Sequence, residues 1–514
     1  MIRATILATT FILTSSLAPA GERAVHAQPV KNPTKTSFSK RDFVQGDLSL
    51  ERAVSIALEQ NPDLLRAIKE IERTRGQVIE VRAQALPHVG LNATYDQQDK
   101  YLLEETNGGG SSLKFTDAAG NTIDLGDAFN RSGNNAGDKN WRIAIEARQL
   151  LYSGGQVTAA LKIAKFTEDQ SYFMLRDTLD RVIATVRTQF YRVLLNRRLI
   201  TVAEESIRLL QDQLKDQQNR LEAGTVPRFN VLQAEVALAN SQPDLIRARN
   251  NYLVAQLELS RTLGLEASRS ATGKPSFTAV GDLRAIDRKL SLQGALAAAR
   301  AHRPFLKAQQ QTIFSEEQQI TVAKAGLKPR LDAHAGWEMR NSRLTDDLSK
   351  EVNGWYFGVT GDWAIFDGFA TKGKVMQAQA RLATAEITYA DSVLQVELEV
   401  QQAYARLQEA RELITSQEKV VEQADEALRL ARERLSAGAG TQLDVLNAQV
   451  ALTRARTTQQ EALYDFNVAL AEFDRATGAN TVYDDSFHDP KAVEVKRTTT
   501  KVVPVSRKTS RKSK

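Results

Sequence analysis

The sequence predicts a mainly α-helical protein that carries a few amphipathic β-strands and consists of two copies of one unit. Three observations predict this fold class. Short motifs recur in the same order in both halves, apolar residues keep heptad spacing over long stretches, and short segments between them alternate between apolar and polar residues. The composition agrees, because 6% of the residues are aromatic while 42% are hydrophobic, a balance that favours long helices.

The duplication is visible in paired motifs that keep fixed distances along the chain. The early pairs are separated by 242 residues (290 − 48) and the later pair by 214 (366 − 152), which places 28 extra residues (242 − 214) in the first copy. We therefore predict repeats at 48–265 and 290–478, joined by a linker at 266–289. The paired motifs are Leu48-Ser49-Leu50 with Leu290-Ser291-Leu292, Asn61-Pro62 with Arg303-Pro304, and Tyr152-Ser153-Gly154 with Phe366-Asp367-Gly368.

Each repeat contains a long helical hairpin, predicted at 154–264 and at 368–477. Apolar residues with 3–4 spacing, starting near Val182 in the first copy, continue for about six heptads, which indicates a coiled-coil seam. The first helix of each hairpin would be about 100 Å long. Gly224 and Gly438 follow the seams and predict short turns between antiparallel helices.

Two pairs of strands are predicted, at 88–98 with 140–150 and at 330–339 with 355–365. Apolar and polar residues alternate along each strand, and aromatic residues stand near the ends, as in transmembrane strands. A half-buried strand of a soluble sheet would show the same alternation. The Gly- and Asn-rich segment 99–140 predicts an exposed loop. Four strands cannot close a barrel, and an open sheet edge cannot face lipid, so a membrane-embedded sheet would require oligomerisation.

The N-terminus has the pattern of a cleaved secretory signal peptide over residues 1–27, which a linker at 28–47 follows. Arg3 precedes an apolar stretch, and small residues suited to cleavage end at Ala20 and Ala27. We predict cleavage after Ala27 rather than an uncleaved membrane anchor, because the stretch is short for spanning a bilayer. No later segment approaches the roughly 20 apolar residues of a membrane-spanning helix.

The net charge of +6 comes from a basic C-terminal tail at 479–514. Lys491 to Lys514 contains nine Lys and Arg residues and one acid, Glu494, so the rest of the chain carries −2 (6 − 8). A basic tail can bind nucleic acid. On an exported chain we favour a disordered, solvated tail, and we predict no nucleic-acid partner.

Residue types that carry chemistry are few and scattered. The chain has no cysteine, which excludes disulfides, thiolate catalysis, Cys-ligated metals and a lipid-modified N-terminal Cys; it is not predicted to be a lipoprotein. No Ser-His-Asp order, His-Glu-x-x-His motif or glycine-rich phosphate loop is evident. We predict no enzyme activity, no cofactor and no metal site. The five histidines are His26, His88, His302, His334 and His488.

The ordered set of motifs resembles the TolC family of trimeric outer-membrane channels. The resemblance covers about 48–478 and rests on the order, spacing and duplication of the motifs rather than on any single one. Its marks are Leu48-Ser49-Leu50-Glu51-Arg52-Ala53 through Asn61-Pro62, the glycine turns Tyr152-Ser153-Gly154-Gly155 and Phe366-Asp367-Gly368, and the paired segments Arg220-Leu221-Glu222-Ala223-Gly224 and Arg434-Leu435-Ser436-Ala437-Gly438.

The resemblance implies a homotrimer in the outer membrane. Three chains with four strands each would form a 12-stranded β-barrel that continues as a long periplasmic α-helical barrel. Helices at 49–86 and 291–327 would stack end to end with 231–263 and 445–477, and residues 266–289 and 479–490 would form a belt around the middle. The barrel would contact outer-membrane lipid. A periplasmic adaptor (membrane fusion) protein and an inner-membrane pump or ABC exporter would complete the duct, for efflux or type I secretion of a drug, a metal or a protein.

The resemblance also implies a channel constriction after the second hairpin turn. Asp444 matches the first aspartate of the family's acidic constriction, Asn447 stands where a second one is common, and Asn230 is the equivalent of Asp444 in the first copy. Gly440 occupies a position where some members have an arginine that locks neighbouring chains. The alternative makes Asp444 an N-cap of the returning helix.

The two hairpin tips are the predicted docking points for the adaptor. Leu221 and Leu435 could instead simply end the coiled-coil core. A different class of function, a trimeric coiled-coil structural or adhesin protein of the outer membrane, would carry its four strands consecutively at the C-terminus, unlike this chain. The predicted docking residues are Arg220, Leu221, Gly224, Thr225, Arg434, Leu435 and Gly438.

Overall fold

The computed structural model describes residues 46–99, 139–265, 277–286, 288, 290–341 and 348–479, together with the backbone of 114–116 and 122–124. The predicted signal peptide, the tail from residue 480, most of the 28–47 linker and most of the 99–140 loop lie outside the described residues. So does part of the 266–289 linker.

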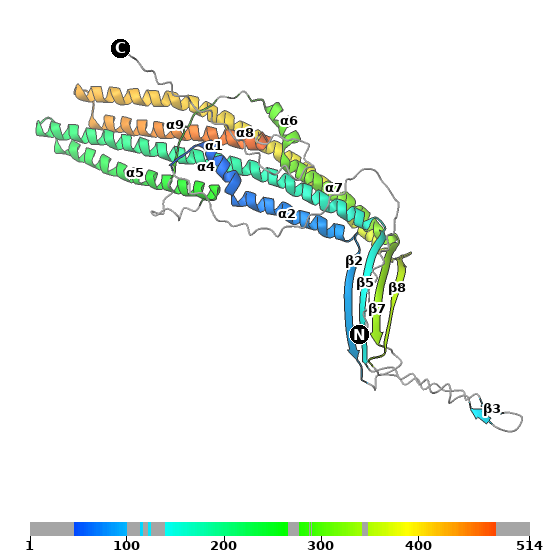
Figure 1. Ribbon diagram of the computed structural model, residues 1–514. Helices are drawn as coiled ribbons and strands as arrows, with labels where there is room; N and C mark the ends of the chain where they lie inside the picture. The colour runs from blue at the N-terminus through cyan, green and yellow to red at the C-terminus, as the bar shows by residue number, and fades with distance from the viewer. Residues whose placement is uncertain are drawn as a thin grey trace, which may run out of the picture. The chain divides into compact units, whose positions relative to one another are not determined.

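The described chain is mainly helical, and its elements recur in one order (Figure 1). Among the helices of these residues, none has both the length and the apolar character needed to cross a membrane. The helices are α1 (Leu50–Gln60), α2 (Pro62–Ala83), α4 (Gln156–Glu222), α5 (Arg228–Leu263), α6 (Leu292–His302), α7 (Pro304–Lys324), the 3₁₀ turn η3 (Ala325–Leu327), α8 (Ala370–Ser436) and α9 (Gln442–Thr477). The strands are β1 (Gly46–Leu48), β2 (His88–Gln97), β3 (Lys114–Thr116), β4 (Thr122–Asp124), β5 (Lys139–Ser153), β6 (Phe277–Ala279), β7 (Arg330–Asn341) and β8 (Glu351–Asp362).

The four long helices form two antiparallel hairpins, α4 with α5 and α8 with α9. Both α4 and α8 have 67 residues, so each is about 100 Å long. The two hairpins meet along α4 and α9, which leaves α5 and α8 as the outer helices of the set. Residues of the heptad seam, such as Val186 and Val400, are fully buried.

Each of the shorter helical segments is broken in two, which differs from the single helices predicted at 49–86 and 291–327. The breaks fall at Asn61-Pro62 and Arg303-Pro304. Proline lacks a backbone N–H and excludes the helical conformation for the residue before it, and Asn61 and Arg303 have ψ values of 127° and 117°. The prolines therefore start α2 and α7 as separate helices.

The break allows α2 to continue the line of α5 (Figure 1). Asn61 joins the two ends. Its side-chain oxygen accepts hydrogen bonds from the first N–H groups of α2, at 2.8 and 3.2 Å, while its Nδ2 donates to the carbonyl of Thr262 in the last turn of α5 at 2.7 Å. One amide thus satisfies donors of one helix and an acceptor of the other.

Arg303 makes the equivalent joint in the second repeat by ionic contacts. Its buried guanidinium donates to the carbonyl of Arg475 in α9 at 2.9 Å and to Glu399 of α8 at 3.1 Å. Asp177 of α4 lies 3.7 Å from the same guanidinium. The charge is compensated by two carboxylates, and α7 is tied to three long helices at once.

The hydrophobic cores of the two repeats use corresponding positions. Ala53 and Ala57 of α1 pack with Val182, Val186 and Leu259, and the residues 242 or 214 positions later form the second core. That second set is Ala295, Ala299, Val396, Val400 and Phe473.

Among the residues that the structure describes, a short parallel strand pair adds to the first core. β1 and β6 pair over 46–48 and 277–279, and Leu48, Phe277 and Ala279 are buried. The pair was not predicted, because three residues are too few for a visible alternation. It ties the segment before α1 to the described part of the 266–289 linker.

The four longer strands form one antiparallel sheet in the order β2-β5-β7-β8. The central pair β5–β7 joins the two repeats. β5 contains an irregularity between Leu150 and Tyr152, near its junction with α4. All four strands connect to helices at the same end of the sheet (Figure 1).

The joint between α5 and α2 makes a prediction about stability. Gly264 has φ +75°, and a Cβ there would lie 2.4 Å from the carbonyl oxygen of Gln60. Gly224 has a similar φ of +70° with open space around it. Both alanine variants incur the cost of the left-handed conformation, about 1–2 kcal/mol, but Gly264→Ala also forces the joint apart. We expect a clearly larger drop in Tm for Gly264→Ala, measured by circular dichroism at 222 nm in detergent. Equal drops would contradict the close joint.

Candidate functional site

One face of the four-stranded sheet is apolar and exposed. The register places Leu91, Ile145, Trp337 and Trp355 in one row across the four strands. Leu91 is 70% exposed and Trp355 82% exposed. No other part of the described chain covers this row of large apolar side chains. Such an exposed apolar surface indicates contact with an apolar environment.

Aromatic residues gather at both ends of this face. Tyr95 and Trp141 lie opposite each other toward the end away from the helices, whereas Trp363, Phe366 and Phe369 follow β8 at the helical end. The indole N–H of Trp363 donates to the carbonyl of Leu327 at 3.1 Å. Aromatic rings with an apolar body and a polar contact suit the interfaces of a bilayer.

Among the residues that the structure describes, Phe369 is the one non-glycine residue with a positive φ, at +68°. It caps α8 and packs edge-on against Phe366, with ring centroids 5.5 Å apart. The equivalent position of the first repeat, 214 residues earlier, is Gly155, which has φ +92°. The left-handed conformation at Phe369 is strained for an aromatic residue.

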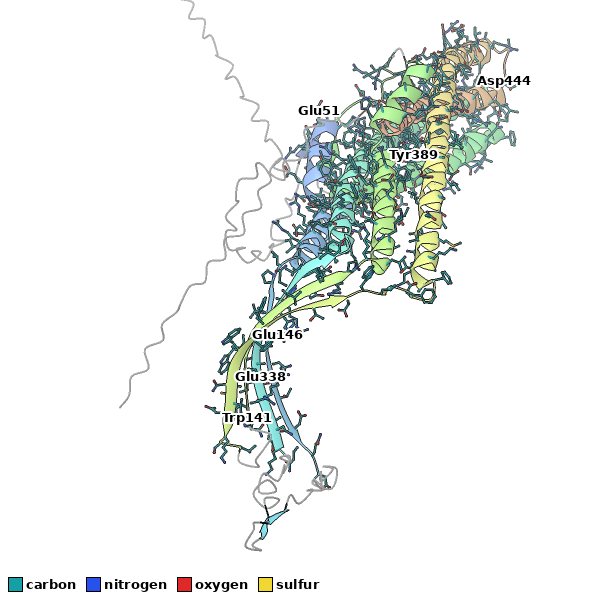
Figure 2. The ribbon with its side chains drawn as sticks, turned by 90° about the vertical axis from the view of Figure 1, so that its right-hand side faces the viewer. Glu51, Trp141, Glu146, Glu338, Tyr389 and Asp444 are labelled. Atoms are coloured by element: carbon teal, nitrogen blue, oxygen red, sulfur yellow. The ribbon has the colours of Figure 1, made fainter. Side chains whose placement is uncertain are left out.

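The opposite face of the sheet is polar and carries ion pairs. Arg142 lies 2.7 Å from Glu338, and Arg148 lies 2.5 Å from Glu146. The hydroxyl of Tyr356 donates to Glu146 at 3.1 Å. Figure 2 shows Glu146 and Glu338 on the strands, with Trp141 further along. The two faces thus differ completely in chemistry, as the alternation predicts.

The two outer strands have free edges. β2 pairs with β5 and β8 with β7, and neither has a second strand neighbour among the residues that the structure describes. An unpaired edge offers a row of N–H and C=O groups for further pairing. Since the strands alternate in direction, β2 and β8 run in opposite directions.

The outer helices carry exposed apolar residues with helical spacing. On α5 these are Phe229, Leu232 and Val236, and Phe229 is 70% exposed. On α8, Ile387 and Leu394 are spaced by one heptad and are also exposed. Both stripes lie on the helices at the edge of the set, where a further helix can pack.

The hairpin tips are exposed turns. Gly224 and Gly438 have φ values of +70° and +74° and end α4 and α8. Arg434 donates to the carbonyl of Ala439 at 3.2 Å, and the hydroxyl of Thr225 donates to the carbonyl of Arg220 at 2.9 Å.

The remaining predicted tip residues differ in their packing. Arg220 also pairs with Asp216 at 2.9 Å. Leu435 packs beside buried Leu428 and Val445, so its contact within the chain is that of a core residue. Leu221 is half-buried.

Asp444 lies at the start of α9, at the tip end of the helices (Figure 2). It is not the N-cap, which corrects the alternative interpretation of this residue. Thr441 is the cap: its hydroxyl accepts from the Asp444 N–H at 3.2 Å, and the Asp444 carboxylate accepts from the Thr441 N–H at 2.9 Å. This reciprocal pair is a capping box.

The capping box affects the charge of Asp444. Hydrogen bonds from Thr441, and more weakly the charge of Arg434, hold the pKa of the Asp444 carboxyl below its usual range. A folded-state pKa below the unfolded value stabilises the fold above about pH 4, and this contribution is lost as pH falls further. Within one chain the carboxylate is therefore ionised at neutral pH.

The other two predicted constriction residues are Asn447, three positions after Asp444, and Asn230, the equivalent of Asp444 in the first repeat. Asn447 is exposed one turn further along α9. Asn230 is half-buried in the first turn of α5, where its N–H donates to the carbonyl of Pro227 at 3.0 Å. Gly440 sits against the Arg434 Cβ, 3.1 Å from the position that a Cβ would take.

A buried glutamine seam between the hairpins was not predicted. Gln217 of α4 and Gln442 and Gln449 of α9 are at least 96% buried. Gln213 donates to Gln442 at 3.4 Å, and Gln449 donates to the carbonyl of Ser206 at 3.2 Å. Glutamine is polar, so a heptad pattern predicts that these residues are exposed. Only the position of the second hairpin against the first shows that they are buried.

Comparisons with known proteins agree on one family. The family model described as outer membrane efflux protein matches residues 53–265 and 295–479. The chain is 24% identical over 421 residues to protein CyaE of Bordetella pertussis, covering 81% of each chain. It is 22% identical over 453 residues to the solvent efflux pump outer membrane protein SrpC of Pseudomonas putida, covering 87% of this chain and 88% of that one. The solved Campylobacter jejuni CmeC outer membrane channel is similar in fold, with a TM-score of 0.69 at 15% identity over 86% of this chain and 88% of that one.

Proposed function

Since the chain belongs to the outer membrane efflux protein family, we propose that it is the outer-membrane exit duct of a tripartite efflux pump or a type I secretion system. The resemblance to the TolC family is thereby confirmed. This is a family of channel proteins rather than of enzymes. The observation that carries the proposal within the chain is the two-faced sheet, which has an exposed apolar face, a charged face and two free edges.

The orientation of the sheet follows from the chemistry of its faces. The rows around Leu91 and Trp355 would face lipid, and the face with Glu146 and Glu338 would line a water-filled lumen. Aromatic residues at both ends of the apolar face would lie at the two bilayer interfaces. The helices would extend from one interface into the periplasm.

A homotrimer would satisfy the free edges. β8 of one chain can pair with β2 of the next, because the two strands run in opposite directions and the antiparallel pattern continues. Three chains arranged head to tail close a ring of 12 strands (3 × 4), and closure removes every edge. The exposed stripe of α5, near the tips, and that of α8, nearer the sheet, would then each pack against a helix of a neighbouring chain.

The helical tips are the part furthest along the helices from the sheet. We assign adaptor docking to Gly224, Thr225, Arg434 and Gly438, which are exposed, and to Arg220, which is half-buried beside them. Leu221 and Leu435 would set the end of the coiled coil beneath that surface, as the packing of Leu435 on Val445 supports. The adaptor would be a periplasmic membrane-fusion protein linked to an inner-membrane pump or ABC exporter.

The constriction would lie beside the tips. Asp444 and Asn447 are exposed on the first turns of α9, and three copies around an axis would form a ring of carboxylates. Mutual repulsion would oppose the low pKa that the capping box causes in the single chain. With one carboxylate per chain in this ring, and glycine at Gly440, block by multivalent cations would be weak. Asn230 would contribute a neutral position from the first repeat.

The first test is of the trimer and its helical contact. Leu394 of α8 is 63% exposed in the single chain, so Leu394→Glu leaves the fold of the chain intact but places a charge in the interface. We expect native mass spectrometry in detergent to report three chains for the natural protein and a lower trimer fraction for Leu394→Glu. Gln395→Glu adds the same charge beside it and should leave the trimer unchanged. A stable, folded monomer of the natural chain in lipid would contradict the architecture.

The second test separates gating from capping at Asp444. Asp444→Asn removes the charge, whereas Thr441→Ala removes the capping hydroxyl and keeps the charge. In planar bilayers we expect Asp444→Asn to lose cation selectivity and block by multivalent cations, and Thr441→Ala to keep both. If both variants behave like the natural channel, Asp444 serves only the capping box.

The third test is of tip docking. Gly438 needs a positive φ, and its N–H donates to the carbonyl of Leu435 at 3.2 Å; proline allows neither. We expect Gly438→Pro, and likewise Gly224→Pro, to abolish export from cells while the trimer remains in the outer membrane. Gly438→Ala should retain partial export. Normal export with both proline variants would rule out docking at these turns.

A further inference from the structure

Two histidines and an arginine form one row across the polar face of the sheet. The register pairs His88 of β2 with Arg148 of β5, and Arg148 with His334 of β7. Gly358 completes the row on β8. The row lies in the half of the sheet that is next to the helices. We call the polar face of this half the inner half; it extends from the row that contains Glu146 to the row that contains Asp362.

The other charges of the inner half nearly cancel. β5 contributes Glu146 and Arg148, β7 contributes Arg330 and Asp332, and β8 contributes Asp362. These two cations and three anions sum to −1 (2 − 3). Tyr356 of β8 faces the same region and is neutral in this pH range. The remaining residues around His88, from the helix and strand ends, are Gln84, Leu150, Ser153, Gln156 and Val157, none of which titrates.

The imidazole of His334 occupies the space that a side chain at position 358 would fill. A Cβ at Gly358 would lie 2.6 Å from its Nε2, so the glycine leaves room for the ring to lie across β8. The ring of Tyr356 is close by, with centroids 6.2 Å apart. His334 also borders a hollow of about 720 Å³, whose lining includes Tyr356 and all five charged residues counted above. Arg142 and Glu338 also line it, and because they form an ion pair the sum stays at −1. A proton on His334 would therefore change the charge of an open, polar cavity.

We propose that His88 and His334 determine the ion selectivity of the inner half of the lumen. This rests on the proposed trimeric channel. Imidazole is the side chain whose charge ordinarily changes between pH 5 and 8. Protonation of both histidines changes the inner half from −1 to +1 per chain, and from −3 to +3 in a trimer. With both histidines protonated, the wall attracts anions instead of cations.

The test uses the full-length protein in planar bilayers with a KCl gradient. The reversal potential is measured at pH 7.5 and pH 5.0, in the natural channel and in the Asp444→Asn background, which removes the carboxylate ring at the tips. We expect acidification to shift the selectivity of the Asp444→Asn channel toward anions. The double variant His88→Gln and His334→Gln should lose this shift, and each single variant should lose part of it.

The controls use matched positions. His302→Gln changes an exposed histidine on α6 and should keep the whole shift. Gly358→Ala displaces the His334 imidazole and should change conductance, whereas Gly354→Ala, with open space around it on the same strand, should not.

The outcomes separate the inference from the proposed function. Conducting trimers whose selectivity is the same at both pH values would overturn the inference, and so would a shift that survives the double variant. Absence of conducting trimers from the natural chain would contradict the proposed function itself, and the inference with it.

Discussion

Each backbone N–H and C=O along an unpaired strand edge needs a hydrogen-bond partner, and hydrocarbon offers none. The sheet β2-β5-β7-β8 has two such edges and one exposed apolar face. Much of the proposed assembly depends on this constraint. In the proposed assembly, pairing of the edges closes a ring of strands, and the helices of neighbouring chains would sit side by side as a continuation of that ring.

Beside the continuous helices α4 and α8, the chain contains long columns made from two helices placed end to end. α5 and α2 form such a column, as do α9 and α7, and the joints are held by Asn61 and Arg303. The neutral joint uses a single amide, which caps one helix and satisfies the other. The charged joint brings Asp177, Glu399 and Arg475 together around a buried guanidinium. Removing one partner of such a group leaves a buried charge uncompensated, so the second joint is the more sensitive of the two.

The contact between the two hairpins changes character along its length. Near the joints it is apolar, with Phe190 and Phe466 fully buried, and near the tips it includes Gln217, Gln442 and Gln449. The burial of apolar side chains stabilises a contact without requiring a particular geometry. A buried amide, in contrast, needs hydrogen-bond partners. Each of these three glutamines has one side-chain oxygen or nitrogen atom without a hydrogen-bond partner among the described residues. The tip half of the contact is therefore held less firmly than the half near the joints, where the cores of both repeats lie.

The sequence by itself determined the fold class, the duplication pattern of the motifs and the approximate place of the long helices and strands, because heptad spacing and strict alternation are local properties of the chain. It also located the breaks at Pro62 and Pro304 as motifs, but not as helix ends that meet other helices. The capping of α9 by Thr441 rather than Asp444 is a contact between residues three positions apart, and the Thr-x-x-Asp spacing of a capping box could have predicted it. Only the tertiary structure decided that heptad glutamines are buried, and that His88, Arg148 and His334 share a row. These facts depend on register and on contacts between residues about 60 to 240 positions apart, and no local pattern records which distant residue fills the facing position.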